Sequence, residues 1–197
     1  KKMNILVTGG AGFIGSHVVD KLISLNKEVI IIDDLSSSNI GYINPKAKFI
    51  NINICSQEID QIFQKNVDTV IHLAAQINVV KSIKDPLFDA KTNILGGLNL
   101  LEHCKKHNVK NFIYINSAAE IGEPNKIPIT EEHSINPISH YGISKHVFEH
   151  YLRLYSRLYG LKYTILRLSN VYGPRQNSLG EGGVISIFIN KLLKNGK

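Results

Sequence analysis

Short apolar runs alternate along the chain with longer segments whose apolar residues recur every three or four positions. The short runs are rich in isoleucine and valine, which favours buried β-strands. Six strands are predicted: Asn4–Thr8, Glu28–Asp33, Lys48–Ile52, Thr69–Leu73, Asn111–Asn116 and Lys162–Leu168. The periodic segments predict helices over Phe13–Leu25, Leu87–His107, Tyr141–Tyr159 and Val184–Leu193. Between the last two strands, Glu123–Pro137 contains three prolines and is expected to be a long loop.

The alternation of strands and helices predicts the fold class. Each strand–helix–strand unit joins two parallel strands, and the helices then cover both faces of the sheet. We therefore expect an α/β protein with a doubly wound parallel sheet and three layers, α/β/α. At 197 residues the default is a single domain.

Composition and charge exclude several classes of protein. No apolar run approaches the roughly 20 residues that a membrane span needs, so no membrane association is expected. The formal net charge is +7, from 23 basic and 16 acidic residues, but the lysines are scattered, and nucleic acid is not an expected partner. Cys55 and Cys104 lack the spacing of a metal or redox motif. We expect free thiols and a cytoplasmic location.

A glycine-rich segment joins the first predicted strand to the first helix. Gly9, Gly12 and Gly15 satisfy Gly-x-x-Gly-x-x-Gly, and Gly10 adds Gly-x-Gly-x-x-Gly. Glycines permit a tight turn and let the backbone approach a pyrophosphate, which then meets the positive end of the helix. This context predicts a dinucleotide site in a Rossmann fold.

The second predicted strand ends in an acid, Asp33, followed by Asp34. A carboxylate there can accept hydrogen bonds from the adenosine ribose and would repel a 2′-phosphate. No lysine or arginine follows within several residues, so the expected cofactor is NAD rather than NADP. The alternative is a solvated pair of acids at a strand end.

Tyr141 and Lys145 are four residues apart at the start of a predicted helix, so they share one face. A neighbouring ammonium favours the phenolate, which lets a tyrosine exchange a proton with a substrate hydroxyl. Ser117 follows the fifth predicted strand, at the edge where open α/β sheets bind ligands. The same Tyr–Lys spacing at Tyr42 and Lys46 includes a proline, which disfavours a helix there.

These motifs together resemble the extended short-chain dehydrogenase/reductase family, and within it the NAD-dependent sugar-nucleotide epimerases and dehydratases. The resemblance covers essentially the whole chain. Its marks are Thr8–Gly15, Asp33–Ser36, His72–Ala75, Asn93 with Gly96, Ser117–Ala119, Tyr141–Lys145 and Asn170–Arg175.

The resemblance implies a role for each matching residue. Ser117, Tyr141 and Lys145 match the catalytic trio, and Asn170 joins Ser117 and Tyr141 as a substrate-binding residue. The residues implied to contact the cofactor, besides Tyr141 and Lys145, are Gly9, Gly12, Phe13, Ile14, Gly15, Asp33, Asp34, Leu35, Ser36, Asn53, Ile54, Leu73, Ala74, Ala75, Gln76 and Asn93. Three positions depart from the family pattern, namely Asn53, Ile121 and Ser169.

The residues after Ser117 distinguish the activities within this family. Dehydratases usually carry Asp-Glu there and decarboxylases a Glu at the second position, whereas this chain has Ala118 and Ala119, with Glu120 displaced by one residue. The resemblance therefore implies epimerisation of a nucleotide sugar at C4, of the UDP-glucose/UDP-galactose type, through a transient 4-keto intermediate. A dehydratase or decarboxylase, or a non-catalytic NAD-binding domain, is the alternative.

Complete relatives continue into a substrate-binding lobe, so residues 1–197 are expected to be the NAD-binding domain alone, with Gly196 as a helix C-cap. Relatives also pair as homodimers through two helices, which here would be Leu87–His107 and Tyr141–Tyr159.

His146-x-x-Glu149-His150 matches an inverted zincin pattern, but the sequence suggests no third ligand, and no metal is expected. Both histidine pairs, His146 with His150 and His103 with His107, are expected to be surface residues.

Overall fold

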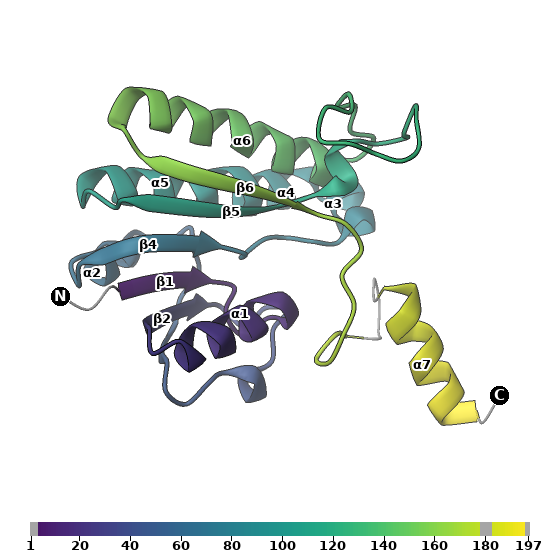
Figure 1. Ribbon diagram of the computed structural model, residues 1–197, viewed down its shortest axis with the longest axis horizontal. Helices are drawn as coiled ribbons and strands as arrows, with labels where there is room; N and C mark the ends of the chain where they lie inside the picture. The colour runs from purple at the N-terminus through teal and green to yellow at the C-terminus, as the bar shows by residue number, and fades with distance from the viewer. Residues whose placement is uncertain (1–3, 178–182, 196–197) are drawn as a thin grey trace.

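The computed structural model describes residues 4–177 and 183–195, and a six-stranded parallel sheet forms its centre (Figure 1). The strand order is β3-β2-β1-β4-β5-β6, and every neighbouring pair is parallel. The strands are β1 (Asn4–Thr8), β2 (Glu28–Asp33), β3 (Lys48–Asn51), β4 (Val67–His72), β5 (Asn111–Ser117) and β6 (Lys162–Leu168).

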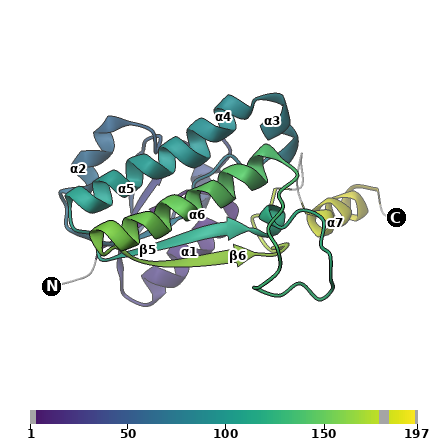
Figure 2. The same ribbon diagram turned by 90° about the horizontal axis from the view of Figure 1, so that it is seen from above.

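Helices cover the sheet on both faces. One face packs against α1, and the other packs against α2, α5 and α6, the last two of which lie side by side (Figure 2). The helices are α1 (Phe13–Ser24), α2 (Asp60–Phe63), α3 (Val79–Lys84), α4 (Pro86–Ala90), α5 (Gly96–Lys106), α6 (His140–Tyr159) and α7 (Val184–Asn195). Within these ranges, none is both long and apolar enough to cross a bilayer.

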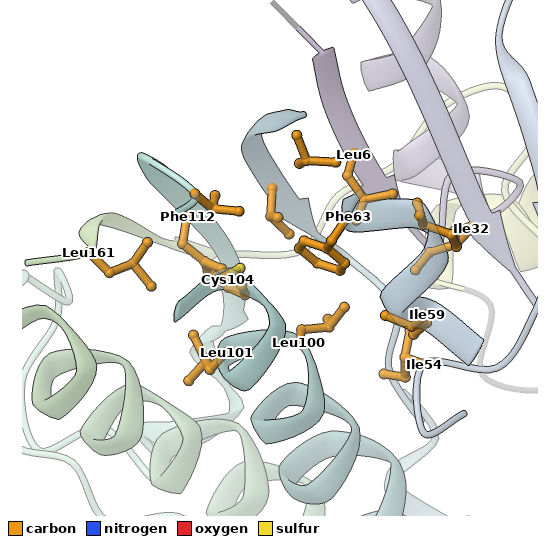
Figure 3. Packing of buried hydrophobic residues seen from close by; sticks show 14 of the residues in the cluster. Leu6, Ile32, Ile54, Ile59, Phe63, Leu100, Leu101, Cys104, Phe112 and Leu161 are labelled. Carbon is orange, nitrogen blue, oxygen red and sulfur yellow. The ribbon is translucent and has the colours of Figure 1, made fainter. Parts of the chain in front are cut away.

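Alternation along the strands produces two separate hydrophobic cores. Leu6 of β1 points into the core beneath α5 and α6, whereas its neighbours Ile5 and Val7 point toward α1. The core beneath α5 and α6 is the larger, and Phe63, Leu100 and Cys104 fill its centre (Figure 3). The central strands are continuous apolar runs in the sequence because both of their faces are buried. The predicted doubly wound fold is confirmed.

The structure differs from the sequence prediction in the middle of the chain. The expected helix Leu87–His107 is divided into α4, a π-helical turn over Lys91–Leu95, and α5. After this division, α5 packs closely against α6: a Cβ on Gly97 would lie 2.4 Å from the Phe148 ring. Periodicity also missed α2 and α3, which are four and six residues long, too short to show it. The expected C-cap, Gly196, lies outside the described residues.

Two isoleucines, one buried in the larger core and one exposed, test how much this core contributes to the free energy of unfolding. Ile59 is fully buried, whereas Ile40, in a similar short 3₁₀ turn, is 66% exposed. Ile59→Ala should lower the free energy of unfolding by about 2–5 kcal/mol, because it leaves a cavity among packed side chains. Ile40→Ala should change it by about 0.5 kcal/mol or less. Urea unfolding of the two variants measures both, and equal losses would contradict this assignment of the core.

Candidate active site

A cleft of about 420 Å³ opens at the carboxyl edge of the sheet. It lies where β1 and β4 are neighbours while their following connections run in opposite directions, the position at which doubly wound sheets bind ligands. Most of the predicted cofactor residues line it: Gly9, Gly12, Phe13, Ile14, Gly15, Asp33, Asp34, Ser36, Asn53, Ile54, Leu73, Ala74 and Ala75. The cleft also brings together Ser117, Tyr141, Lys145 and Asn170, from segments far apart in the sequence.

The glycine-rich loop forms one wall of the cleft. A Cβ on Gly15 would lie 2.1 Å from the carbonyl oxygen of Gly9, so the loop and the first turn of α1 can approach only because this residue has no side chain. Gly12 is the N-cap of α1, and no side chain caps the helix. The first N–H groups of α1 are therefore suited to a pyrophosphate.

Asp33 ties the end of β2 to the glycine-rich loop. Its Oδ2 accepts hydrogen bonds from the Ala11 N–H (3.0 Å) and the Ser38 hydroxyl (3.1 Å), and its Oδ1 accepts one from the Leu35 N–H. The residue is only 6% exposed. Besides the predicted ribose contact, Asp33 thus holds two loops around the cleft.

Asn53 takes part in a contact that the family's usual aspartate could not make. Its Nδ2 donates to Asp34 Oδ2 at 2.6 Å, where a second carboxylate would repel the first. Burial raises the pKa of Asp34, but hydrogen bonds from Ser36 and Asn53 outweigh it and lower the pKa overall. The departure at Asn53 therefore fits a charged Asp34 at this end of the cleft.

Three predicted cofactor residues lie away from the cleft wall. Leu35 has a left-handed backbone and binds Asp33 through its N–H. Asn93 is 3% exposed; its Oδ1 accepts from the Gln76 N–H, and its Nδ2 donates to Ser144 Oγ of α6. The Gln76 side chain donates to Asp89. These bonds join the loop after β4 to the helix that carries Tyr141.

The start of α6 is fixed by several independent contacts. Ser139 caps the helix by accepting a hydrogen bond from the Gly142 N–H, and the Tyr141 N–H donates to Ser82 Oγ at 3.1 Å. A Cβ on Gly142 would lie 2.5 Å from the Ala119 carbonyl oxygen, so α6 and the turn after β5 are in close contact. In that turn Ser117 Oγ accepts from the Ala119 N–H, which leaves its proton able to donate.

Lys145 is buried beneath the cleft, with only 4% of the residue exposed. Its Nζ donates to the Ile115 carbonyl oxygen at 2.6 Å and lies 4.3 Å from the centre of the Tyr114 ring. Burial lowers the pKa of Lys145 to about 7, although the nearby carboxylates of Glu120, Asp89 and Glu149 oppose that shift. Near neutral pH, Lys145 therefore exists both as the charged ammonium and as the neutral amine.

A buried polar network behind the cleft was not anticipated from the sequence. Asn116 Oδ1 accepts from the Ser117 N–H, while its Nδ2 donates to Glu120 and Glu149. Arg167 of β6 pairs with both carboxylates, and its Nη2 is 2.9 Å from Glu149 Oε2. The available signal was a polar residue, Asn116, at a buried strand position. The network positions Ser117, and Glu120 does not line the cleft.

The inverted zincin pattern is part of this same network. His146 Nδ1 lies 3.3 Å from Glu120 Oε2, and His150 Nε2 lies 3.0 Å from His146 Nε2. The glutamate of the pattern, Glu149, accepts two hydrogen bonds from Arg167. The guanidinium thus supplies the positive charge that a metal ion would otherwise supply.

The fold and the cleft define a Rossmann-type nucleotide-binding protein. The chain belongs to the NAD dependent epimerase/dehydratase family, whose sequence model matches residues 5–197.

Known relatives agree with this assignment. A Methanocaldococcus jannaschii protein, provisionally named a UDP-glucose 4-epimerase, is 54% identical over 97% of this chain. The Thermotoga maritima UDP-glucose 4-epimerase, solved with UDP-glucose, is 49% identical over 98% of the chain, with a TM-score of 0.95. The Thermus thermophilus UDP-glucose 4-epimerase, solved with NAD, is 40% identical over 98%, with a TM-score of 0.93. The chain spans 63% of the length of each of these relatives.

Burial of Lys145 should leave a signature in the pH dependence of stability. The folded pKa, about 7, lies below the ordinary value of 10.5, so between these values the unfolded chain binds more protons than the folded one. Stability should therefore rise as the pH increases above 7, by up to about 1.4 kcal/mol per pH unit for one proton, and this contribution should be constant below pH 7.

Lys145→Met should abolish that rise. Urea unfolding of the ligand-free chain at intervals from pH 6 to 9.5 measures the effect as the difference between wild type and variant. Parallel curves over this range would contradict the burial of a titrating ammonium.

Proposed function

We propose that this chain is the NAD-binding part of a UDP-sugar 4-epimerase, acting on substrates of the UDP-glucose/UDP-galactose type through a transient 4-keto sugar. The observation that carries the proposal is that Ser117, Tyr141 and Lys145 line the same cleft as the glycine-rich loop. The names of the Thermotoga and Thermus relatives support the same reaction.

The cleft fits NAD at both ends. At one end, the backbone at Gly9 and Gly15 packs too closely against Ala74 and the loop itself to admit a Cβ, and this packing leaves the uncapped start of α1 in the cleft, where a pyrophosphate would bind. At the outer end, Asp33 and Asp34 are suited to ribose hydroxyls and would repel a 2′-phosphate. Bound NAD would supply the reversible oxidation and reduction of the sugar carbon.

The reaction requires a proton to leave and return to the sugar 4-hydroxyl. Tyr141 Oη would take this proton, while the Ser117 hydroxyl would orient the substrate oxygen. Lys145 would favour the Tyr141 phenolate through its charge and hold the nicotinamide ribose. Asn170, which is exposed in the cleft, would contact the nucleotide-sugar phosphates.

Elimination of water is less well supported as the reaction. It needs an additional acid and base beside the substrate, and the two positions after Ser117 are Ala118 and Ala119. The nearest acid along the chain, Glu120, is fully buried and pairs with Arg167, and it does not line the cleft. Simple oxidation and re-reduction of the sugar needs neither group.

Tyr141→Phe removes the proposed proton acceptor and keeps the aromatic ring. In the full-length protein, kcat for interconversion of UDP-galactose and UDP-glucose should fall at least about a hundredfold. NAD affinity, measured by calorimetry on the same protein, should fall no more than about tenfold, because the hydroxyl would make at most one hydrogen bond to the dinucleotide, worth about 0.5–1.5 kcal/mol. Loss of activity and NAD binding together would contradict this division of roles.

The rival proposal is a non-catalytic NAD-binding domain on the same fold. Full-length protein incubated with UDP-galactose distinguishes the two, since only an epimerase produces UDP-glucose without net consumption of NAD. A protein that binds NAD but leaves the sugar unchanged would favour the rival.

We also propose that the protein forms a homodimer in the cytoplasm, where its free thiols would remain reduced. The expected interface, over α4–α5 and α6, has exposed apolar side chains. They include Leu87 (82% exposed), Leu95 (59%), Leu154 (44%) and Leu158 (58%). Such a cluster is typical of a protein–protein contact.

Replacing Leu95 and Leu154 together by Glu should convert the dimer to a monomer, because it buries two unpaired charges at the interface. Light scattering after size exclusion of the full-length protein measures the mass. Ile40→Glu, at an exposed isoleucine outside the proposed interface, should leave the dimer intact. A double variant that stays dimeric would contradict this choice of helices.

A further inference from the structure

Two histidines and an aspartate join α5 to α2 at the edge of the sheet opposite the cleft. His103 lies in the last turn of α5 and His107 is its C-cap residue, so with four-residue spacing they share one face. Asp60 is the first residue of α2. Because α5 ends just before β5 begins, the three residues lie near the amino ends of the strands, remote from the catalytic trio.

The three side chains converge on one point. Asp60 Oδ1 lies 2.8 Å from His107 Nε2 and 3.2 Å from His103 Nδ1. One ligand atom from each residue lies within 4.8 Å of the others. Zinc bonds of about 2.0–2.2 Å place ligand atoms roughly 3.3–3.5 Å apart in a tetrahedral site, so the two separations from Asp60 Oδ1 lie within about 0.7 Å of those expected around a bound ion.

A second observation, on His103, points to a ligand at this position. The residue is only 8% exposed, so the expectation that it lies on the surface is wrong. Its buried Nδ1 is 3.2 Å from Asp60 Oδ1, but the two do not have the geometry of a hydrogen bond. Stacking on Phe63, at 5.5 Å for His103 and 5.9 Å for His107, fixes both rings.

Lys106 is the group with which a metal would compete. Its Nζ lies 2.8 Å from the same Asp60 oxygen, but its side chain is 61% exposed, so it can turn into solvent at little cost. The other histidine–carboxylate cluster differs in this respect. At Glu120, His146 and Glu149 the counter-charge is Arg167, which is 27% exposed and bound to both carboxylates.

From this geometry we propose that Asp60, His103 and His107 form a site for a divalent transition-metal ion of the zinc type. Imidazole nitrogens with one carboxylate suit this class of ion. Three protein ligands leave a fourth position for water. The site would clamp α2 to α5 and stabilise the fold without touching the cofactor cleft.

Zinc titration of the chain itself, without a histidine tag and after treatment with a chelator, tests the proposal. Calorimetry should give one zinc ion per chain. At a zinc concentration a hundred times the dissociation constant, the thermal midpoint should rise by about 5–10 °C. Cobalt(II) in place of zinc should give the visible absorption of a tetrahedral nitrogen–oxygen site.

Matched variants identify the ligands. His107→Gln and Asp60→Asn should each weaken zinc binding at least tenfold, whereas His150→Gln, at a histidine outside the cluster, should leave it unchanged. Each midpoint shift is taken relative to the same variant without zinc, so a change in basal stability does not affect the result. Absence of one-to-one binding at 100-fold molar excess of zinc, or binding that survives both ligand substitutions, would overturn the proposal.

Discussion

The chemistry proposed for this protein depends on a buried ammonium group. Lys145 Nζ is removed from water, and a backbone carbonyl of β5, an aromatic ring and three nearby carboxylates compensate only part of that cost. The contact fixes α6 against β5, and therefore Tyr141 against Ser117. A lysine with a lowered pKa, inside a cleft and next to a tyrosine, is typical of a functional site.

Two polar networks support this arrangement from opposite sides. Asn93 and Gln76 join the loop after β4 to α6, and Asn116 with Glu149 and Arg167 joins β5, α6 and β6. Both are buried, so each member must be satisfied by the others or leave a costly unpaired group. The two networks share no hydrogen bond, but each ends on α6, through Ser144 in one and Glu149 in the other, so the position of this helix at the cleft depends on both.

The sequence predicted the elements that have strong periodicity and the residues that belong to local motifs. All six strands, α1, α6 and α7 were located within two residues at every boundary. The residues of the glycine-rich loop and of the trio line one cleft. Short helices such as α3 have too few residues for a pattern. Gln76 and Asn93 match a family motif, but only the three-dimensional structure shows that their side chains point into a supporting network. Pairs of residues far apart in the chain, such as Arg167 and Glu120, have no characteristic spacing in the sequence, so no pattern predicts them.

A crystal structure of this protein with NAD bound would test the proposed reaction most directly. We expect the pyrophosphate over Gly12 and the start of α1, and the nicotinamide ribose within hydrogen-bonding distance of Tyr141 Oη and Lys145 Nζ. A dinucleotide bound with its nicotinamide end away from those two side chains would contradict the proposed reaction and leave only a nucleotide-binding fold.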